Sequence, residues 1–299
     1  MLYHLLLQTV KTQQSAGVSP GQPHLLQYDL NGSEDVDKAV NDLSQETKGG
    51  QLYVLADEVM SEYIVLFSMV NIFKTFCHKL LTQVPHLHLW AASYFHGDAP
   101  VGWQVEYLTR PLRSPPAVVR EVKQDVRITT DRHVKPYSKR GVPDHTDGPP
   151  VTRLYHRGQG HSGDGPGDCV TCGREVASFL HSLRDGVTAT VTTSSTPISC
   201  GSTPPCLQWR DVLLLSSDSW RDSCGMVRTL IEAGIPVRVM KDDDMEDVAT
   251  ARSDVVWAAV GDHVLGLERK VVVCPYDVGG SVRLHLMSRC TSQLVIVSR

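Results

Sequence analysis

Residues 52–58, with the sequence LYVLADE, form an apolar run of strand length that ends in two adjacent carboxylates. A strand is expected over Gln51–Ala56, a helix over Val59–Leu81 and a second strand over His86–Ser93 (HLHLWAAS). Short apolar runs that alternate with helical patterns are typical of a parallel sheet covered by helices on both faces. The sequence therefore predicts an α/β fold.

The same alternation continues to the end of the chain. Helices are expected over Pro115–Lys123 and about Cys169–Leu183, on either side of a strand over Val151–His156. The later expected elements are strand Asp211–Ser216, helix Ser223–Ala233, strand Val237–Met240, strand Val255–Ala259, strand Val271–Cys274, helix Val282–Cys290 and strand Gln293–Val297. No internal repeat is visible, so a solenoid or propeller is not indicated.

The composition indicates a folded protein of one large or two ordinary domains. Hydrophobic residues make up 41% of the 299-residue chain and charged residues 21%, which argues against disorder. The net charge of −4 excludes a uniformly basic surface. Any contact with nucleic acid would therefore need a local groove rather than bulk charge.

The sequence gives no sign of secretion or membrane insertion. The N-terminal residues lack the basic region of a signal peptide, and the apolar stretch Tyr63–Leu81 is interrupted by polar and charged residues. Eight cysteines in 299 residues are too few for a small disulfide scaffold. We expect an intracellular protein, in nucleus or cytoplasm, with no membrane partner.

The carboxylates that end the first strand, Asp57 and Glu58, have the arrangement called Walker B. A buried strand holds the first carboxylate where Mg²⁺ can bind, and the second can orient an attacking water. Ligands of α/β proteins bind at the carboxyl ends of parallel strands, which is where these residues are expected. The alternative is a helix N-terminus whose dipole attracts negative charge.

Three later stretches occur together in a fixed order. They are LTRPLRSPP at Leu108–Pro116, GLERKVVV at Gly266–Val273 and LMSRCTSQLVIV at Leu286–Val297. In order and context they resemble motifs IV, V and VI of the superfamily 1, UvrD-like DNA and RNA helicases. The resemblance covers roughly residues 50–125 and 208–299, and leaves 129–206 unexplained.

The resemblance implies two lobes joined by an irregular connection. The chain would carry parallel-sheet, RecA-like lobes of the P-loop NTPase type, with the first lobe incomplete. Residues 1–128 would form that partial first lobe, and residues 207–299 the second lobe. Residues 129–206 would be an irregular connection, rich in Gly, Pro and His, with one helix.

The resemblance also implies roles for individual residues. Arg113 and Arg289 would reach the γ-phosphate of ATP from opposite sides of an interdomain cleft, a task that suits an always-charged, forked guanidinium. Glu268 would accept a hydrogen bond from the ribose, and Asp57 would hold the Mg²⁺ of the nucleotide. The remaining residues expected at the nucleotide are Gly266 and Asp98, and 259–263 would lie near a nucleic-acid strand.

The chain departs from the helicase pattern at three places. Val101 follows Gly97-Asp98-Ala99-Pro100 where motif III has a glutamine, and Leu265 replaces the usual lysine before Gly-Leu-Glu. No Gly-Lys-Ser or Gly-Lys-Thr occurs in the 299 residues. We therefore expect an N-truncated motor, part of a larger polypeptide, that neither hydrolyses ATP nor unwinds duplexes as an isolated chain.

Cys169-Val170-Thr171-Cys172 and the pair Cys200 and Cys206 could supply four zinc ligands, with His156 and His161 as substitutes. However, the first pair opens an amphipathic helical pattern, and the second pair is widely spaced in a Thr/Ser/Pro-rich loop. The sequence therefore predicts no stoichiometric zinc.

Three functions stay open at this point. In the first, the chain is a helicase-type module that binds ATP and single-stranded DNA or RNA, and Trp90, Trp103 and Trp257 are candidate residues for stacking on bases. Alternatively, it is a non-catalytic interaction or scaffold domain derived from such a helicase. The third alternative is an unrelated nucleotide-binding α/β protein in which Arg113 and Arg289 have no role.

Overall fold

A computed structural model describes most of the chain beyond its N-terminal residues. The described residues are 28, 33–47, 51–56, 66–92, 102–109, 111, 113–131, 134–138, 147–157, 160–161, 163–185, 207–264, 266–275 and 280–299. By internal contacts the chain divides into two compact units. Unit 1 contains Arg110–Asp131 and Pro136–Arg299, and unit 2 contains Leu6–Thr109 and Arg132–Lys135.

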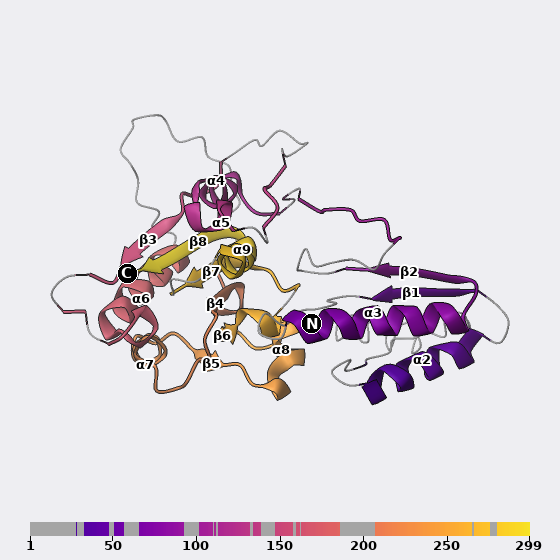
Figure 1. Cartoon of the computed structure of the whole chain (residues 1–299). Coiled ribbons are helices and arrows are strands. Elements are labelled where there is room, and N and C mark those ends of the chain that lie inside the picture. Colours follow the sequence, from indigo (N-terminus) through magenta and orange to yellow (C-terminus); the bar gives the residue numbers. More distant parts are fainter. Residues whose placement is uncertain are drawn as a thin grey trace, which may run out of the picture. The chain divides into compact units, whose positions relative to one another are not determined.

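Unit 1 is built on a six-stranded sheet in which every neighbouring pair of strands is parallel (Figure 1). The strands are β3 (Thr152–Tyr155), β4 (Val212–Ser216), β5 (Val237–Val239), β6 (Val256–Val260), β7 (Arg269–Cys274) and β8 (Cys290–Ser298), in the order β3-β8-β7-β4-β6-β5. The first strand of the C-terminal region, β4, lies between β7 and β6. After β4 the chain forms β5 at one edge of the sheet, returns to place β6 between β5 and β4, and then adds β7 and β8 on the other side of β4. Strands on both sides of the starting strand are typical of a doubly wound sheet.

Helices cover both faces of this sheet. They are α4 (Pro116–Gln124), α5 (Val126–Thr129), α6 (Val170–Arg184), α7 (Gly225–Glu232), α8 (Met245–Thr250) and α9 (Gly280–Ser288), with short 3₁₀ turns η1 (Pro166–Asp168), η2 (Trp209–Asp211), η3 (Asp242–Asp244) and η4 (Gly261–Val264). In Figure 1, α6 and α7 lie together to the left of β4, β6 and β5. Helix α9 lies on the other side of the strands and contacts α4 and α5. This is the arrangement that right-handed crossovers impose on a doubly wound sheet.

The central strand shows why the apolar runs are continuous. All five residues of β4 are buried. Leu214 packs into the cluster that joins the sheet to α6 and α7, while the neighbours Leu213 and Leu215 point to the opposite face and are equally buried. Each such leucine contributes about 1.5–3 kcal/mol by leaving water. A strand covered on both faces needs no polar alternation.

Unit 2 is smaller, and its described helices pack against one face of a two-stranded sheet. It contains α2 (Ser33–Thr47), β1 (Leu52–Ala56), α3 (Leu66–Gln83) and β2 (Leu87–Ala91), with β1 parallel to β2. The inward-facing Leu52, Val54, Leu87 and Leu89 pack against a core formed by α2 and α3. The residues between them along each strand face outward.

The α/β prediction is confirmed at the level of a six-stranded parallel sheet and a two-stranded parallel sheet. The expected helix over Val59–Leu81 corresponds to α3, and residues 57–65 lie outside the described residues. Helices α2, α5 and α8 are not among the expected elements. Residues 129–206, expected as a connection, contribute β3 and α6 to the sheet and core of unit 1. No helix in the described ranges is both long and apolar enough to cross a membrane.

Candidate functional site

Two of the predicted site residues lie side by side at the edge of the unit 1 sheet where the amino-terminal ends of its strands meet. Glu268 directly precedes β7, and Arg289 directly precedes β8. The strands are paired there, because Arg269 aligns with Cys290 and its N–H donates to the carbonyl oxygen of Arg289 at 3.1 Å. Parallel pairing therefore fixes the backbones of Glu268 and Arg289 as neighbours.

Arg113 reaches the same edge from a distant part of the sequence. It belongs to unit 1 together with Arg289, and not to the unit that contains most of residues 1–128, where it was expected. Its Nη1 lies 2.8 Å from Oε2 of Glu268. The neighbouring Ser114 is buried, and its hydroxyl donates to the carbonyl oxygen of Ser288, 174 residues away, at 3.3 Å. Arg113 itself is 75% exposed, so its ion pair contributes at most about 1 kcal/mol. The serine, rather than the ion pair, holds this segment in place.

The carboxylate of Glu268 is only partly satisfied by Arg113. The distance between them meets the criterion for an ion pair, but Oε2 of Glu268 is buried and has no hydrogen-bond partner among the described residues. Charge attraction alone does not fill an acceptor lone pair of the carboxylate. Glu268 therefore retains the capacity to accept a hydrogen bond.

A buried ion pair fixes the helices behind this edge. The guanidinium of Arg283 on α9 donates to the carboxylate of Asp125, and both side chains are 9% exposed. Asp125 also caps α5, since its other oxygen accepts from the backbone N–H of Arg127 at 3.0 Å. Breaking such a buried pair on one side is costly. The segment that carries Arg113 is thus joined to α9, which leads into Arg289.

His285, one helical turn before Arg289, orients the arginine side chain. Nε2 of His285 lies 3.1 Å from the carbonyl oxygen of Gly261, so Nε2 carries the proton and donates. Nδ1 is then the acceptor of the ring, and Nη2 of Arg289 donates to it at 2.8 Å. Burial, with the positive charge of Arg289, lowers the pKa of His285 to about 3. The imidazole is therefore neutral at physiological pH.

The loop after β6 packs closely against α9. A Cβ on Gly261 would lie 2.3 Å from Cδ2 of Leu286, so only glycine fits there without a shift. The loop ends at Gly266, which has a φ of 77° and turns the chain into β7. Residues 259–263, which the helicase resemblance assigns to the nucleic-acid strand, thus adjoin the helix that carries His285.

Tyr137 lies close enough to Arg289 for their charges to interact. Burial raises the pKa of this phenol, and the positive charge of Arg289 opposes that rise. Sequence reasoning missed both Tyr137 and His285. His285 could have been found, because residues four apart share one face of a helix. No sequence signal marks Tyr137.

Asp57, Glu58 and Asp98 lie outside the described residues. Their expected convergence with Arg113 and Arg289 stays a prediction.

The three tryptophans proposed for stacking have different environments. Trp257 is 1% exposed and belongs to the core of unit 1, so it cannot stack on a ligand without unfolding. Trp103 packs edge-on against Phe73. Only Trp90 is largely exposed, at 54%, and it stacks with His88.

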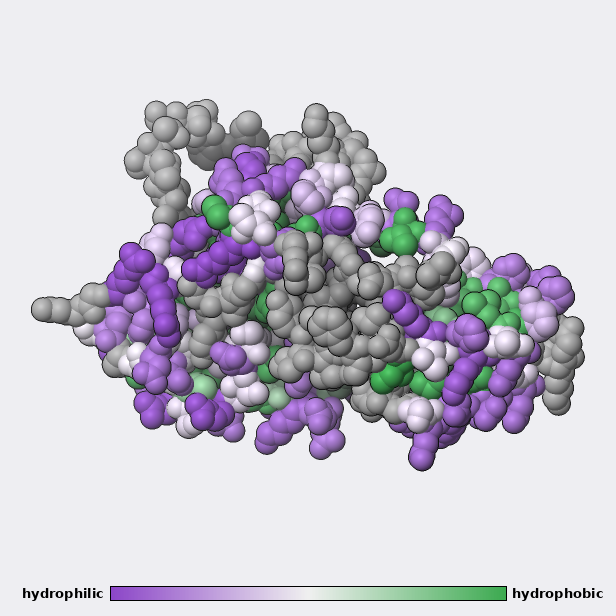
Figure 2. All heavy atoms as spheres, viewed as in Figure 1, coloured by the Kyte–Doolittle hydropathy of each residue, from purple (hydrophilic) through white to green (hydrophobic). Residues whose placement is uncertain are grey.

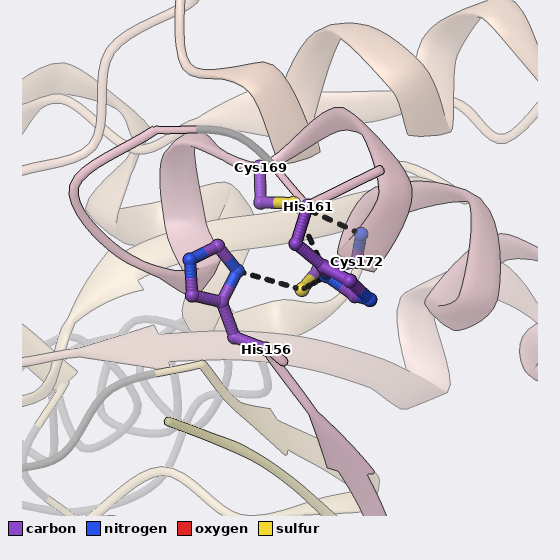
Figure 3. A group of neighbouring side chains, drawn as sticks. All are labelled: His156, His161, Cys169 and Cys172. Carbon is purple, nitrogen blue, oxygen red and sulfur yellow. Dashed lines mark hydrogen bonds between the residues drawn. The ribbon is translucent and has the colours of Figure 1, made fainter. Parts of the chain in front are cut away.

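Away from this edge, two histidines and two cysteines meet at the carboxyl end of β3 (Figure 3). We call His156, His161, Cys169 and Cys172 the histidine–cysteine cluster. One ligand atom from each lies within 4.8 Å of all the others. Both cysteines are buried and not in disulfides, and burial raises the pKa of Cys172 to about 12. Cys200 and Cys206, the alternative ligands, lie outside the described residues.

Comparison with known proteins gives no further assignment: no family model matches the chain, and no curated protein matches it.

Proposed function

We propose that this chain is a helicase-like motor module that binds ATP and acts on single-stranded nucleic acid, with unit 1 as its second RecA-like lobe. The supporting observation is that three segments with the resemblance to UvrD-like helicases meet at one edge of the sheet. They are the segment of Arg113, the residue Glu268 before β7, and Arg289 before β8. The three residues come together from positions 113, 268 and 289 of the sequence, as a shared binding site would require.

The chemistry of this edge suits a nucleotide phosphate. Arg113 is exposed and is paired with a carboxylate that it can release at a cost of at most about 1 kcal/mol. A phosphate oxygen would replace that carboxylate and bind the guanidinium fork. Glu268 would then be available to a ribose hydroxyl, as the resemblance implies.

Arg289 would bind the same nucleotide phosphate, but its guanidinium is already oriented by His285. His285 accepts from its Nη2 and directs the guanidinium, while the neutrality of the imidazole leaves the positive charge on the arginine alone. Preorganised charge of this kind is most effective where negative charge develops on a transferred phosphoryl group. Arg289 would therefore sense and stabilise the γ-phosphate.

The fold is compatible with this assignment. The strands β4 to β8 form a contiguous doubly wound sheet within 207–299, the range proposed for the second lobe, and β3 adds one strand at the edge. Asp57, with Mg²⁺, and Glu58 belong to the same proposal as the residues that would act on the nucleotide from the first lobe. Because the 299 residues contain no Gly-Lys-Ser or Gly-Lys-Thr, the isolated chain is expected to bind nucleotide weakly and not to hydrolyse it.

A non-catalytic interaction or scaffold domain is the alternative, and one observation favours it. The outward face of β1 and β2 exposes Tyr53, Leu55 and Trp90, at 61%, 82% and 54%. Green, hydrophobic atoms appear in this part of the surface in Figure 2. Parallel sheets are normally covered on both faces, so such a face suits a protein partner.

Calorimetric titration of the chain with Mg²⁺–ATP and with AMP tests the proposal. We expect ATP to bind more tightly than AMP, and Arg113→Gln or Arg289→Gln to weaken ATP binding about tenfold or more. Arg252→Gln is the matched control, because it removes another Arg–Glu pair with the same separation of 2.8 Å, to Glu246.

The control variant should bind ATP like the wild type. If the wild-type chain binds no nucleotide, or if all three variants bind equally well, the proposal is wrong and the scaffold alternative stands. Anisotropy of a labelled single-stranded oligonucleotide, which should bind less tightly as salt is raised, tests the nucleic-acid part separately.

A further inference from the structure

We propose that the histidine–cysteine cluster binds a structural zinc ion that joins the end of β3 to the start of α6. The cluster is at the carboxyl end of β3, whereas Glu268 and Arg289 lie at the amino edge of the sheet. It is therefore a separate site, independent of the nucleotide proposal. It also revises the expectation, drawn from the cysteine spacing alone, that the chain holds no stoichiometric zinc.

The distances between ligand atoms match a tetrahedral zinc site. Nδ1 of His161 lies 3.4 Å from Sγ of Cys172 and 3.6 Å from Sγ of Cys169. Nδ1 of His156 lies 3.4 Å from Sγ of Cys172. Zinc bonds to sulfur and nitrogen at tetrahedral angles would separate the two atoms by about 3.6 Å. The side chains thus already have the spacing that a shared zinc requires.

The backbone around the cluster directs its side chains inward. His156 follows β3, whose pairing with β8 continues through a hydrogen bond from the N–H of His156 to the carbonyl oxygen of Ser298 at 2.7 Å. Gly160 and Gly163, with φ of 93° and 92°, bracket His161 and allow the sharp turns that bring it back to the strand end. Figure 3 shows both rings facing the two sulfurs.

The start of α6 holds the two sulfurs next to each other. Cys169 is the N-cap of this helix, and its sulfur accepts from the backbone N–H of Cys172 at 3.4 Å. A divalent cation bound between the two buried sulfurs would displace their protons and bind both as thiolates.

A carboxylate behind His161 completes the arrangement. If Nδ1 of His161 binds the metal, its Nε2 must carry the proton. That Nε2 lies 4.0 Å from Oε1 of Glu175, whose other oxygen is buried with no hydrogen-bond partner among the described residues. A small rotation of the glutamate would let it accept from Nε2. Histidines that bind zinc commonly donate to a carboxylate in this way.

The set of ligands identifies both the metal and its role. Two imidazoles and two thiolates suit zinc, whereas Mg²⁺ and Ca²⁺ prefer oxygen ligands. Four protein ligands leave no open position for water or substrate, so the ion would be structural rather than catalytic. It would tie β3, the edge strand of the sheet, to a helix packed in the core.

Metal analysis of the purified full chain tests this inference. We expect about one zinc per chain, falling below about a tenth in His156→Ala and in Cys172→Ser. His156→Cys is the matched variant, because it changes the same residue but supplies another zinc ligand, and it should keep the metal. Substitution with Co²⁺ should give the intense visible absorption of a tetrahedral site with sulfur ligands.

Two outcomes would overturn the inference. One is a folded wild-type chain, by circular dichroism, that carries no zinc and gives no tetrahedral Co²⁺ spectrum. The other is zinc that persists in His156→Ala but is lost in a Cys200→Ser/Cys206→Ser variant, which would assign the metal to four cysteines. The inference requires the double variant to keep its zinc.

Discussion

Replacing His285 by glutamine should remove part of the acid sensitivity of this protein. The histidine has an unperturbed pKa of 6.5 and a folded pKa of about 3, so between these values the unfolded chain binds the proton and the folded chain does not. Stability contributed by the neutral imidazole is therefore complete above pH 6.5 and is lost as the pH falls toward 3. Glutamine can donate to Gly261 and accept from Arg289, but it does not titrate.

The size of the effect follows from linkage. At pH 7 about a quarter of the unfolded chains carry this proton, and at pH 5 nearly all do, while folded His285 stays neutral at both values. The wild type should therefore lose about 2 kcal/mol more than His285→Gln when the pH is lowered from 7 to 5. Effects of the other titrating groups are common to both proteins and cancel.

Urea unfolding followed by tryptophan fluorescence at pH 7 and pH 5 measures this difference. His263→Gln is the control, because His263 is exposed and lies in the same loop as Gly261. It should follow the wild type at both pH values. If His285→Gln also loses as much stability as the wild type, the imidazole is not held neutral, and our account of how Arg289 is oriented fails.

Two further predictions concern packing and turnover. Gly225→Ala should destabilise the protein by about 1–3 kcal/mol or more, because a Cβ there would lie 2.1 Å from the backbone oxygen of Asp168. Urea unfolding checks this, and Arg228→Ala on the exposed side of the same helix should cost less than about 0.5 kcal/mol. An ATPase assay on the 299-residue chain should show no hydrolysis, and robust activity abolished by Glu58→Gln would reveal a phosphate-binding element not recognised in the sequence.

Much of the fold could be predicted because its signal is local. The sheet of unit 1 is covered on both faces, so the buried parts of β4 and β7 appear in the sequence as the apolar runs VLLL and VVVC. Helix α2 was missed because it is mostly polar, with only one buried stripe that includes Val36 and Val40. A narrow apolar stripe of this kind does not by itself predict a helix, because its burial depends on the core against which it packs.

The candidate sites were predicted less completely, since they depend on distant contacts. Sequence spacing could place Cys169 and Cys172 together, but it could not choose their partners. That choice depends on β3 ending beside α6 and on the turns around His161. The helicase resemblance predicts that Arg113 and Glu268 lie at the same nucleotide, but it does not predict the ion pair between them.

The most direct test of the central claim is to observe the arginine side chains while nucleotide is added. In NMR spectra of ¹⁵N-labelled chain, the Nε–Hε signals of Arg113 and Arg289 can be assigned by their loss in the glutamine variants. Mg²⁺–ATP should shift both signals in a saturable way and leave the signal of Arg252 unchanged. Signals of Arg113 and Arg289 that stay in place while ATP binds elsewhere, or does not bind, would contradict the claim.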